Sequence, residues 1–557
     1  MAQHDYDVLI VGSGFGGSVS AMRLTEKGYS VGVLESGKRW DAETLPKTNW
    51  DVRRFFWFPR VGMRGIQRIS LLKDVMILSG AGVGGGSLVW ANVSYRPHDA
   101  FYRDPQWGGI TDWESELAPY YDQAERMLGV EENSVETNSD RVIKEVAAHF
   151  GVEETFRPTP VAVYFGEKNV EVPDPYFGGE GPTRTGCKQC GGCMVGCRFN
   201  AKNTLQSNYL YMAERHGADV LPQHLVTDVA PLPGGGYSVT TEKPGAWFRK
   251  GRRVFTADHV VFSAGALGTS KLLLRLKESS LPGLSDRLGY QFRTNSEAIL
   301  GASASDTTID YSEGVAITSS IHPEPHTHIE PVRYPVGSNS MGLLTTILVD
   351  GGGRAPRWVR FLAAAVRSPL KIIRAMDLRH WSERSLILLV MQSLDNSLRI
   401  LRKNGRFTTA PDQGRPTPTY IPVANEAARV AAEVMGGEPG SSINEALLDI
   451  PLTAHILGGA PIGETSERGA VDAYHRVFGY PGLHVIDGAA VGANLGVNPS
   501  LTITALAERA IANWPNRGDA DARPELGESY ERLDPVMPMT PIVPSSAIGA
   551  IRWGPST

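Results

Sequence analysis

The feature that most constrains the fold is the stretch YDVLIVGSGFGGSVSAMRLTEKGYSVGVLESG, residues 6–37. It has the pattern of a strand, a glycine turn, a helix and a second strand, with Gly12, Gly14 and Gly17 spaced as G-x-G-x-x-G. Such a turn places backbone N–H groups at a helix amino terminus, where they bind a pyrophosphate. Glu35 ends the second strand, 18 residues after Gly17, and a carboxylate there accepts hydrogen bonds from an adenosine ribose. The stretch predicts a doubly wound α/β domain that binds a dinucleotide.

A second glycine-rich stretch, LSGAGVGGGSLVWANVSY, covers residues 78–95, and five of the seven residues 80–86 are glycine. Backbone without side chains can lie flat against a planar ring or a phosphate, because no Cβ intervenes. We expect Gly84, Gly85 and Ser87 to contact the dinucleotide. The structural alternative is a flexible loop, but the apolar residues on both sides favour a binding loop.

Two later segments return the chain to the first sheet. HVVFSAGALG, residues 259–268, is an apolar strand that enters a glycine turn, and GLHVIDGAAV ends a strand at Asp487 and Gly488. Alternating segments from about 290 to 445 predict a large antiparallel sheet with a hairpin at 404–405. The expected organisation is a dinucleotide-binding domain from residues 1–98, 218–290 and 450–512, a mixed segment at 99–217, a substrate domain at 291–449 and a proline-rich tail at 513–557.

Length and composition exclude several classes of protein. The chain has 557 residues, 41% of them apolar and 21% charged, which suits two intimate globular domains. A net charge of −5 gives no reason to expect a nucleic-acid partner. The sequence has no apolar stretch long enough for a transmembrane helix and no signal-peptide pattern, so we expect a cytoplasmic protein with reduced thiols.

Two polar residues near the carboxyl terminus have the chemistry to act on an alcohol. His455 precedes a Gly-Gly turn, and Asn498 follows 43 residues later, where it can cap a helix that begins at Pro499. If they converge, one side chain can accept a proton from an alcohol while the other orients the hydroxyl. Taken alone, a histidine in this context is more often structural than catalytic.

Four stretches, in this order, resemble the glucose–methanol–choline (GMC) family of flavin oxidoreductases. They are GSGFGG with Glu35, GAGVGGGSL, VVFSAGALGTSKLLL, and the pair HILGG and GVNPSLTITALAERA. The resemblance spans residues 5–512, and within the family it is strongest to the bacterial cholesterol oxidases that hold FAD noncovalently. It implies a Rossmann-like FAD-binding domain, discontinuous in sequence, covered by a substrate domain with a mixed or antiparallel sheet.

The resemblance also implies a reaction and a set of site residues. FAD would take hydride from a secondary alcohol, most closely a steroid 3β-hydroxyl, with a sugar or another lipid alcohol as the alternative substrate. His455 would be the general base and Asn498 would orient the hydroxyl. Electrons would pass to O2 or to an external acceptor. The further expected FAD contacts are Asn92, Val226, Asp487 and Gly488.

The sequence departs from the family pattern at two places. Where the related oxidases have Asn shortly after GGGSLV, this chain has Trp90, and Asn92 follows two residues later. The family's additional acid–base glutamate has two candidates, Glu297 and Glu330, for each of which a structural role is the alternative. These departures weaken the prediction of a sterol more than the prediction of the reaction.

All four cysteines lie in CKQCGGCMVGC, at Cys187, Cys190, Cys193 and Cys197. The C-x2-C-x2-C-x3-C spacing matches the bacterial ferredoxin pattern, although Arg198 stands where proline usually follows. It predicts a 4Fe-4S cluster, with zinc or four metal-free thiols as alternatives. A cluster would favour a dehydrogenase with an external acceptor, since an oxidase delivers electrons to O2 at the flavin.

Three further alternatives remain open at the level of sequence. Residues 356–376 are apolar with five Arg or Lys, which suits either a surface helix on the core or peripheral contact with a membrane. The chain could be a lyase or isomerase in which FAD is structural. It could also be a non-enzymatic electron-transfer protein that works through its cysteines.

Overall fold

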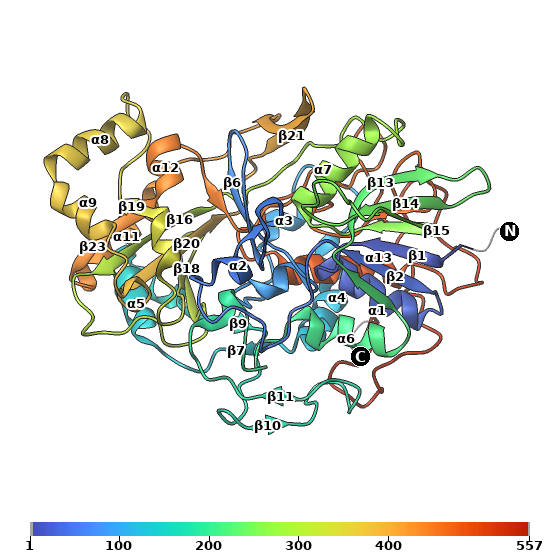
Figure 1. Cartoon of the computed structure of the whole chain (residues 1–557), viewed down its shortest axis with the longest axis horizontal. Coiled ribbons are helices and arrows are strands. Elements are labelled where there is room, and N and C mark those ends of the chain that lie inside the picture. The colour runs from blue at the N-terminus through green and yellow to red at the C-terminus, as the bar shows by residue number, and fades with distance from the viewer. Residues whose placement is uncertain (1–3, 555–557) are drawn as a thin grey trace.

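The computed structural model describes residues 4–554 and contains two large sheets side by side (Figure 1). The first has the order β12-β2-β1-β15-β14-β13, with β25 also paired to β15. Its strands β1, β2, β12, β15 and β25 are parallel, whereas β13 and β14 complete it as an antiparallel hairpin. The bounds are β1 Tyr6–Val11, β2 Val31–Glu35, β12 Asp219–Pro222, β13 Leu225–Pro231, β14 Tyr237–Glu242, β15 Arg253–Phe262 and β25 Leu483–Val485.

Helices from distant parts of the chain cover this sheet. They are α1 Phe15–Glu26, α4 Trp113–Leu128, α6 Tyr209–Arg215, α7 Ala266–Lys277 and α13 Ser500–Ala512. Helix α1 packs against both α6 and α13, so nearly all of its residues are buried. A fully buried ion pair between Arg23 of α1 and Glu508 of α13, at 2.9 Å, joins the two ends of the chain.

The second sheet is antiparallel and has the order β19-β23-β16-β20-β18-β17-β8. Helices α5 and α11 pack on it, and an apolar core lies between them and the sheet. The two sheets confirm the predicted α/β fold with a doubly wound dinucleotide-binding part and an antiparallel part. The bounds are β8 Arg157–Pro158, β16 Ala298–Ala304, β17 Ser319–Glu324, β18 Thr327–Val332, β19 Thr345–Ile347, β20 Ser385–Gln392, β23 Gly437–Ser442, α5 Asn138–Phe150 and α11 Pro422–Val434.

Shorter elements make up most of the remaining secondary structure of the described chain. The helices are α2 Val52–Phe55, α3 Asp99–Tyr102, α8 Arg357–Arg367, α9 Pro369–Ala375, α10 Trp381–Arg384 and α12 Ile443–Leu448. The strands are β3 Trp57–Phe58, β4 Met63–Arg64, β5 Gln67–Leu71, β6 Met76–Gly80, β7 Glu131–Glu132, β9 Pro160–Val161, β10 Glu171–Val172, β11 Arg184–Thr185, β21 Leu398–Lys403, β22 Arg406–Pro411 and β24 Leu452–Thr453. Six 3₁₀ turns complete the described part, among them η2 Gly85–Leu88 and η4 Gly192–Val195.

The structure corrects two local expectations and contains one helix that continues through a proline. Residues 113–128 form this helix, α4, with Pro119 inside it, and Trp113, Leu117 and Met127 are buried along its length. The hairpin at Asn404–Gly405 forms, but as a separate two-stranded sheet, β21–β22. Asn498 does not cap α13: the capping position is Pro499, and the Asn498 side chain contacts Glu330 instead.

The proline-rich tail is an extended wrap over the first domain in the part that the structure describes. Residues 513–554 contain no helix or strand, yet Trp514, Ile542, Val543 and Trp553 are buried. Trp553 donates its indole N–H to Glu508, and Lys27 donates to the carbonyl oxygen of Val536. These contacts hold the described part of the tail against the first domain.

Candidate active site

The first glycine turn brings three backbone segments into close contact. A Cβ atom on Gly12 would lie 2.4 Å from the carbonyl oxygen of Ser263, and one on Gly17 would lie 2.1 Å from that of Gly12. Gly12 also has φ +101°, which favours glycine. A Cβ on Gly14 would meet no atom within 4 Å, so the start of α1 has an open side where a phosphate can approach. Sequence reasoning missed Gly16, where a Cβ would lie 1.8 Å from the carbonyl oxygen of Ile486.

The second glycine stretch packs directly on the first. Gly84 donates its N–H to Ser13 Oγ at 3.1 Å, and a Cβ on Gly85 would lie 2.7 Å from the Cα of Gly14. Ser87 closes the turn by donating its hydroxyl to the carbonyl oxygen of Gly84 at 2.7 Å. The two stretches therefore form one backbone cradle. The second stretch is not a flexible loop but a packed element in which several glycines have positive φ.

Glu35 lies near the start of β13, the strand that contains Val226. One carboxylate oxygen of Glu35 accepts hydrogen bonds from the N–H and hydroxyl of Ser13, and the other accepts from the N–H of Gly37. His224, two residues before Val226, donates its N–H to the carbonyl oxygen of Glu35 at 2.8 Å. The acid therefore stands beside the β1–α1 turn, where a ribose would lie next to a bound pyrophosphate.

Asp487 connects the third glycine turn to the strand β25. Its Oδ2 accepts hydrogen bonds from the Gly265 N–H at 2.8 Å and the Thr269 hydroxyl at 2.6 Å. Burial raises the pKa of Asp487 to about 6, although these hydrogen bonds act in the opposite direction. The carbonyl oxygen of Gly488 accepts from the N–H of Gly458, so this segment also holds the loop that follows His455.

Asn92 is an unsatisfied polar side chain beside the cradle. It is fully buried with φ +72°, and neither its amide oxygen nor its amide nitrogen has a hydrogen-bond partner among the described residues. The indole nitrogen of Trp90 is likewise unpartnered, while its ring contacts Phe15 at the start of α1. Buried polar groups are rarely left unpaired, so both fit a cradle that is completed by a polar planar ligand such as FAD.

His455 is held by a buried carboxylate. Its Nδ1 lies 3.2 Å from Oε2 of Glu297, which is itself held by the Thr453 hydroxyl at 2.8 Å and the Ala454 N–H at 3.1 Å. Burial alone lowers the pKa of His455, but Glu297 outweighs it, and with a smaller effect of Glu330 the pKa is raised above 6.5. Nε2 of His455 is thus the basic atom that remains for a substrate hydroxyl.

Asn498 is held by the second carboxylate. Its Nδ2 donates to Oε2 of Glu330 at 3.1 Å, and its Oδ1 has no hydrogen-bond partner among the described residues. Glu330 is fully buried on β18. The structure therefore brings together His455, Asn498 and both candidate glutamates, each glutamate holding one of the two polar residues.

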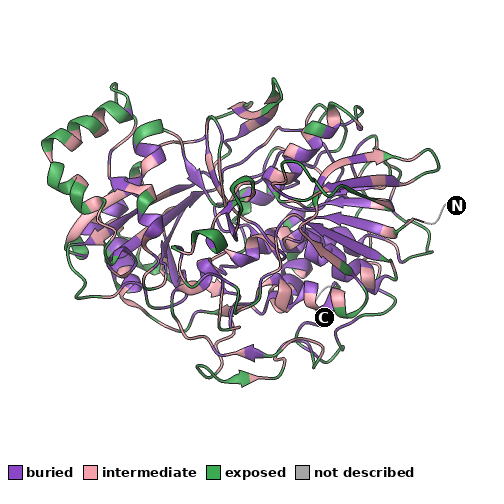
Figure 2. Ribbon diagram, viewed as in Figure 1, coloured by how far each residue is buried: buried purple, intermediate pink, exposed green. Residues whose placement is uncertain are grey.

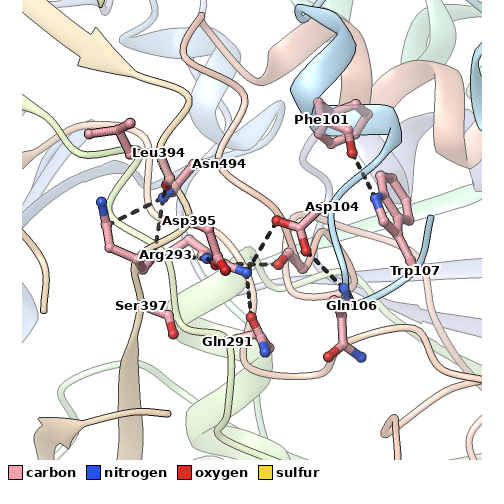
Figure 3. A network of polar contacts seen from close by, with 12 residues as sticks. Phe101, Asp104, Gln106, Trp107, Gln291, Arg293, Leu394, Asp395, Ser397 and Asn494 are labelled. Carbon is pink, nitrogen blue, oxygen red and sulfur yellow. Dashed lines mark hydrogen bonds and ion pairs between the residues drawn. The ribbon is translucent and has the colours of Figure 1, made fainter. Parts of the chain in front are cut away.

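A network of polar groups fixes the segment that leads to Asn498, and Figure 3 shows the part of it around Arg293 and Asn494. Asn295 accepts hydrogen bonds from the N–H groups of Leu495 and Gly496 and donates to the carbonyl oxygen of Val497. Arg293, 1% exposed, donates to the carbonyl oxygen of Gly492 and pairs with acidic groups on either side, as the close view shows. Its acidic partners are Asp395 at 2.6 Å and Asp104 at 3.4 Å.

An apolar cavity of about 610 Å³ opens beside His455. Its walls come from β16 and β20 of the antiparallel sheet, from β24, and from the end of α9 with Trp381. Ala454, the neighbour of His455, is one of the lining residues. The volume lies within the range of about 300–1,000 Å³ that is usual for small-molecule sites, so this cavity is the candidate substrate site.

The four cysteines line a second cavity, of about 630 Å³. No three of their sulfur atoms lie within 4.8 Å of one another in the described chain, whereas Zn–S bonds of about 2.3 Å would place four thiolates about 3.8 Å apart. Burial raises the pKa of Cys187 to about 12 and that of Cys193 to about 11. Lys202 joins this region to the backbone cradle of the glycine stretches, since its Nζ donates to the carbonyl oxygens of Cys193, Leu88 and Trp90.

A dinucleotide-binding sheet joined to a buried His–Asn–carboxylate site is the arrangement of a flavin oxidoreductase that acts on an alcohol. The family model described as GMC oxidoreductase matches residues 6–167 and 183–286 with its amino-terminal part and 374–507 with its carboxy-terminal part. The chain therefore belongs to the GMC oxidoreductase family and is an FAD-dependent alcohol oxidoreductase, as the sequence predicted.

Individual relatives are similar over nearly the whole chain. A cholesterol oxidase of Mycobacterium tuberculosis (strain ATCC 25618 / H37Rv) is 53% identical over 568 residues, covering 99% of this chain and 98% of the relative. A cholesterol oxidase of Acinetobacter baumannii is 46% identical, covering 92% and 95%. Pyridoxine 4-oxidase from Mesorbium loti shares the fold with a TM-score of 0.60 at 16% identity, covering 91% of this chain and 99% of that chain.

Proposed function

We propose that the protein oxidises a steroid 3β-hydroxyl to the ketone, with O2 as the electron acceptor. The observation that carries this proposal is the apolar cavity of about 610 Å³ that reaches Ala454, next to His455. A fused-ring sterol is apolar except for its hydroxyl, and the cavity offers it apolar side chains such as Ile299, Leu386 and Leu389. The relatives of similar length named cholesterol oxidase support the same substrate class.

The site residues have separate tasks in this reaction. Nε2 of His455 accepts the hydroxyl proton, and Glu297 stabilises the imidazolium that forms, because it faces Nδ1 at 3.2 Å. One N–H of the Asn498 amide donates to Glu330, and the second N–H orients the hydroxyl by donating to its oxygen. The apolar walls exclude water from the reacting carbon.

FAD, when bound, supplies the acceptor for the hydride of the carbinol carbon. We propose that its pyrophosphate lies against Gly12, Gly14 and Gly17 and its ribose beside Glu35. The second stretch, with Gly84, Gly85 and Ser87, would lie along the cofactor, and Asn92 would bind the ring. We expect Val226 to contact the adenosine end of FAD. Asp487 and Gly488 should contact the chain that links its flavin ring to its pyrophosphate.

Turnover with a panel of alcohols tests the substrate class. Steroids with a 3β-hydroxyl should give ketone and consume O2 in equal amounts, whereas 3α-epimers, sugars and short alcohols should be turned over far more slowly. Ketone formation from sugars alone would contradict the proposal. Product formation without any change in the redox state of FAD would indicate the lyase or isomerase alternative.

The pair of His455 and Glu297 predicts a pH dependence. Only neutral His455 accepts the hydroxyl proton, so flavin reduction should rise with pH through the raised pKa of His455. Glu297→Gln removes the charge that raises this pKa and leaves burial, which lowers it, so the rise should move to lower pH. Flavin reduction rates measured by stopped flow across roughly pH 5–9 would give the shift. A pH profile unchanged in Glu297→Gln would contradict the role of Glu297.

We also propose that the enzyme contacts a membrane through α8 and α9, which are among the most exposed elements in Figure 2. Trp358, Leu362 and Val366 of α8 and Leu370 and Ile373 of α9 are all at least half exposed. Basic side chains accompany them, namely Arg360, Arg367, Lys371 and Arg374. No helix within residues 4–554 has the length and apolarity to span a bilayer, so the contact would be interfacial.

The position of these helices suggests why a sterol enzyme would use them. Arg374 and Ala375, at the end of α9, line the substrate cavity. A sterol that leaves a membrane under α9 could therefore enter the cavity without crossing water.

The membrane contact predicts a separation between two activities. Val366 is 82% exposed. The variant Val366→Asp should bind vesicles about tenfold more weakly, because an inserted aliphatic side chain contributes about 1.5 kcal/mol or more. Turnover of sterol in vesicles of phosphatidylcholine and phosphatidylserine should fall with it, whereas turnover of detergent-dispersed sterol should not. Val61→Asp, at a site 69% exposed elsewhere, is the matched control. Equal loss in both variants would contradict the proposal.

A second proposal is that Cys187, Cys190, Cys193 and Cys197 bind a 4Fe-4S cluster and that electrons leave through it to an external acceptor. The supporting observations are the cavity that the four cysteines share and the bridge that Lys202 makes to the cradle of the two glycine stretches. The N–H of Gln189 donates to the sulfur of Cys187 at 3.3 Å, a type of contact that tunes such clusters. Reduced thiols require a reducing compartment, so this proposal places the protein in the cytoplasm.

Anaerobic purification distinguishes the two acceptors. If the cluster forms, iron and labile sulfide should be present at about four atoms each per chain, and Cys193→Ser should abolish them while FAD remains. Flavin without iron, together with O2 consumption during turnover, would exclude the cluster and leave the oxidase.

A further inference from the structure

We propose that His98, His322 and His328 form a binding site for a divalent transition-metal ion such as Zn²⁺. One ring nitrogen of each histidine lies within 4.8 Å of those of the other two. The ring centroids of His98 and His322 are 5.2 Å apart and those of His322 and His328 are 4.6 Å apart. Imidazole nitrogens suit zinc, copper and nickel, and three histidines with a fourth position left for water are a known zinc ligand set.

The three histidines are supplied by separate elements of the fold. His322 lies on β17 and His328 on β18, which pair as adjacent antiparallel strands near Ile321 and Ile329. His98 immediately precedes α3. Two of the ligands therefore come from a sheet, which holds their spacing, and the third comes from a neighbouring segment that can close on the ion.

His328 points independently to a missing partner. Its side chain is 1% exposed, and neither of its ring nitrogens makes a hydrogen bond within the described chain. A buried polar group without a partner costs about 1–3 kcal/mol, and a metal ion would satisfy one nitrogen.

A carboxylate lies beside one ring nitrogen of His328. Nε2 of His328 lies 3.2 Å from Oε1 of Glu330, which is fully buried and has no hydrogen-bond partner at that atom. Metal-bound histidines usually present their second nitrogen to a carboxylate or carbonyl oxygen. Glu330 is in the right place for this role, which leaves Nδ1 of His328 for the ion.

The site connects solvent with the alcohol site. His98 is exposed, so an ion can reach the cluster from outside, while the other carboxylate oxygen of Glu330 accepts from Asn498 at 3.1 Å. An ion bound by the histidines would lie one carboxylate away from Asn498. The cluster shares no residue with the cysteine cavity.

Titration of flavin-loaded, chelator-treated protein with Zn²⁺ alone tests the site by calorimetry. We expect a binding event near one equivalent that His322→Ala weakens by about 100-fold or more, since loss of a second-shell partner alone costs about 10–100-fold. Glu330→Gln should weaken Zn²⁺ binding by about 10–100-fold, because Glu330 holds a ligand without touching the ion. His326→Ala is the matched control, because His326 lies between the same two strands but pairs with exposed Glu324. The control should bind Zn²⁺ like wild type.

Two results would overturn the proposal: identical isotherms for wild type and His322→Ala, or an equal loss in His326→Ala. If His322→Ala does not retain FAD, His98→Ala replaces it in the test, because His98 is exposed. The same loss of Zn²⁺ affinity is expected. Co²⁺ separates this site from the thiols, because nitrogen ligands give no thiolate-to-cobalt charge-transfer band. A Co²⁺ spectrum that shows only such a band, unchanged in His98→Ala, would also overturn it.

Discussion

His455→Ala should slow the anaerobic reduction of the flavin by alcohol about 100-fold or more. The estimate follows from the usual contribution of a positioned general base, about 10²–10⁴-fold. The structure gives the reason for expecting this range: Glu297 faces Nδ1 at 3.2 Å and raises the pKa of His455, so that Nε2 is both oriented and more basic.

The test of His455 needs variants that separate chemistry from folding. His216→Ala is the control, because the His216 side chain is 40% exposed and lies 3.8 Å from Glu180. Its reduction rate should equal that of wild type. His455→Gln keeps a polar side chain of similar reach without the base and should be nearly as slow as His455→Ala. A wild-type rate in either His455 variant, at full flavin content, would reject its role.

Gly85→Val should abolish FAD binding. Gly85 has φ +53°, and a Cβ there would lie 2.7 Å from the Cα of Gly14, so the two glycine stretches could not remain in contact. The resulting displacement would separate the halves of the cradle. The ratio of flavin to protein absorbance in the purified protein measures the effect.

A matched glycine controls for backbone strain alone. Gly179 has φ +97°, but a Cβ there would meet no atom within 4 Å. Gly179→Val should therefore keep its full flavin content. If Gly85→Val also kept it, the assignment of this stretch to the cofactor would be wrong. If Gly85→Val did not fold, the smaller Gly85→Ala should still bind FAD more weakly than wild type.

The amino-terminal sheet was predictable because its signals are local. The G-x-G-x-x-G turn and Glu35 lie within one strand–helix–strand unit, and each glycine has a steric reason that a sequence pattern can express. The Asn404–Gly405 hairpin is also a local signal, since both residues have positive φ. Its separation from the main sheet depends on tertiary packing, which no local pattern contains.

The pairing of the site residues could not be derived in this way. Glu297 and Glu330 were recognised as candidates, but only the fold shows that Glu297 contacts His455 and that Glu330 contacts Asn498. Asn295, which holds the chain before Asn498, carries no sequence signal because its partners are backbone groups about 200 residues away. The histidine cluster was missed for the same reason.

Pro119 shows how burial can override a local rule. A proline inside a helix removes a hydrogen bond and usually kinks or breaks the helix. Helix α4 nevertheless continues from Trp113 to Leu128, and its buried face packs on α13. Tertiary contacts that are invisible in the sequence stabilise it.

The central claim is that this chain takes hydride from the carbinol carbon of a sterol in the cavity beside His455. Anaerobic mixing of the oxidised enzyme with a 3β-hydroxysteroid tests it most directly. The account predicts that the flavin band bleaches, that one ketone forms per flavin, and that deuterium on the carbinol carbon slows the bleaching. If neither 3β-hydroxysteroids nor other alcohols bleached the flavin without oxygen, the claim would be contradicted.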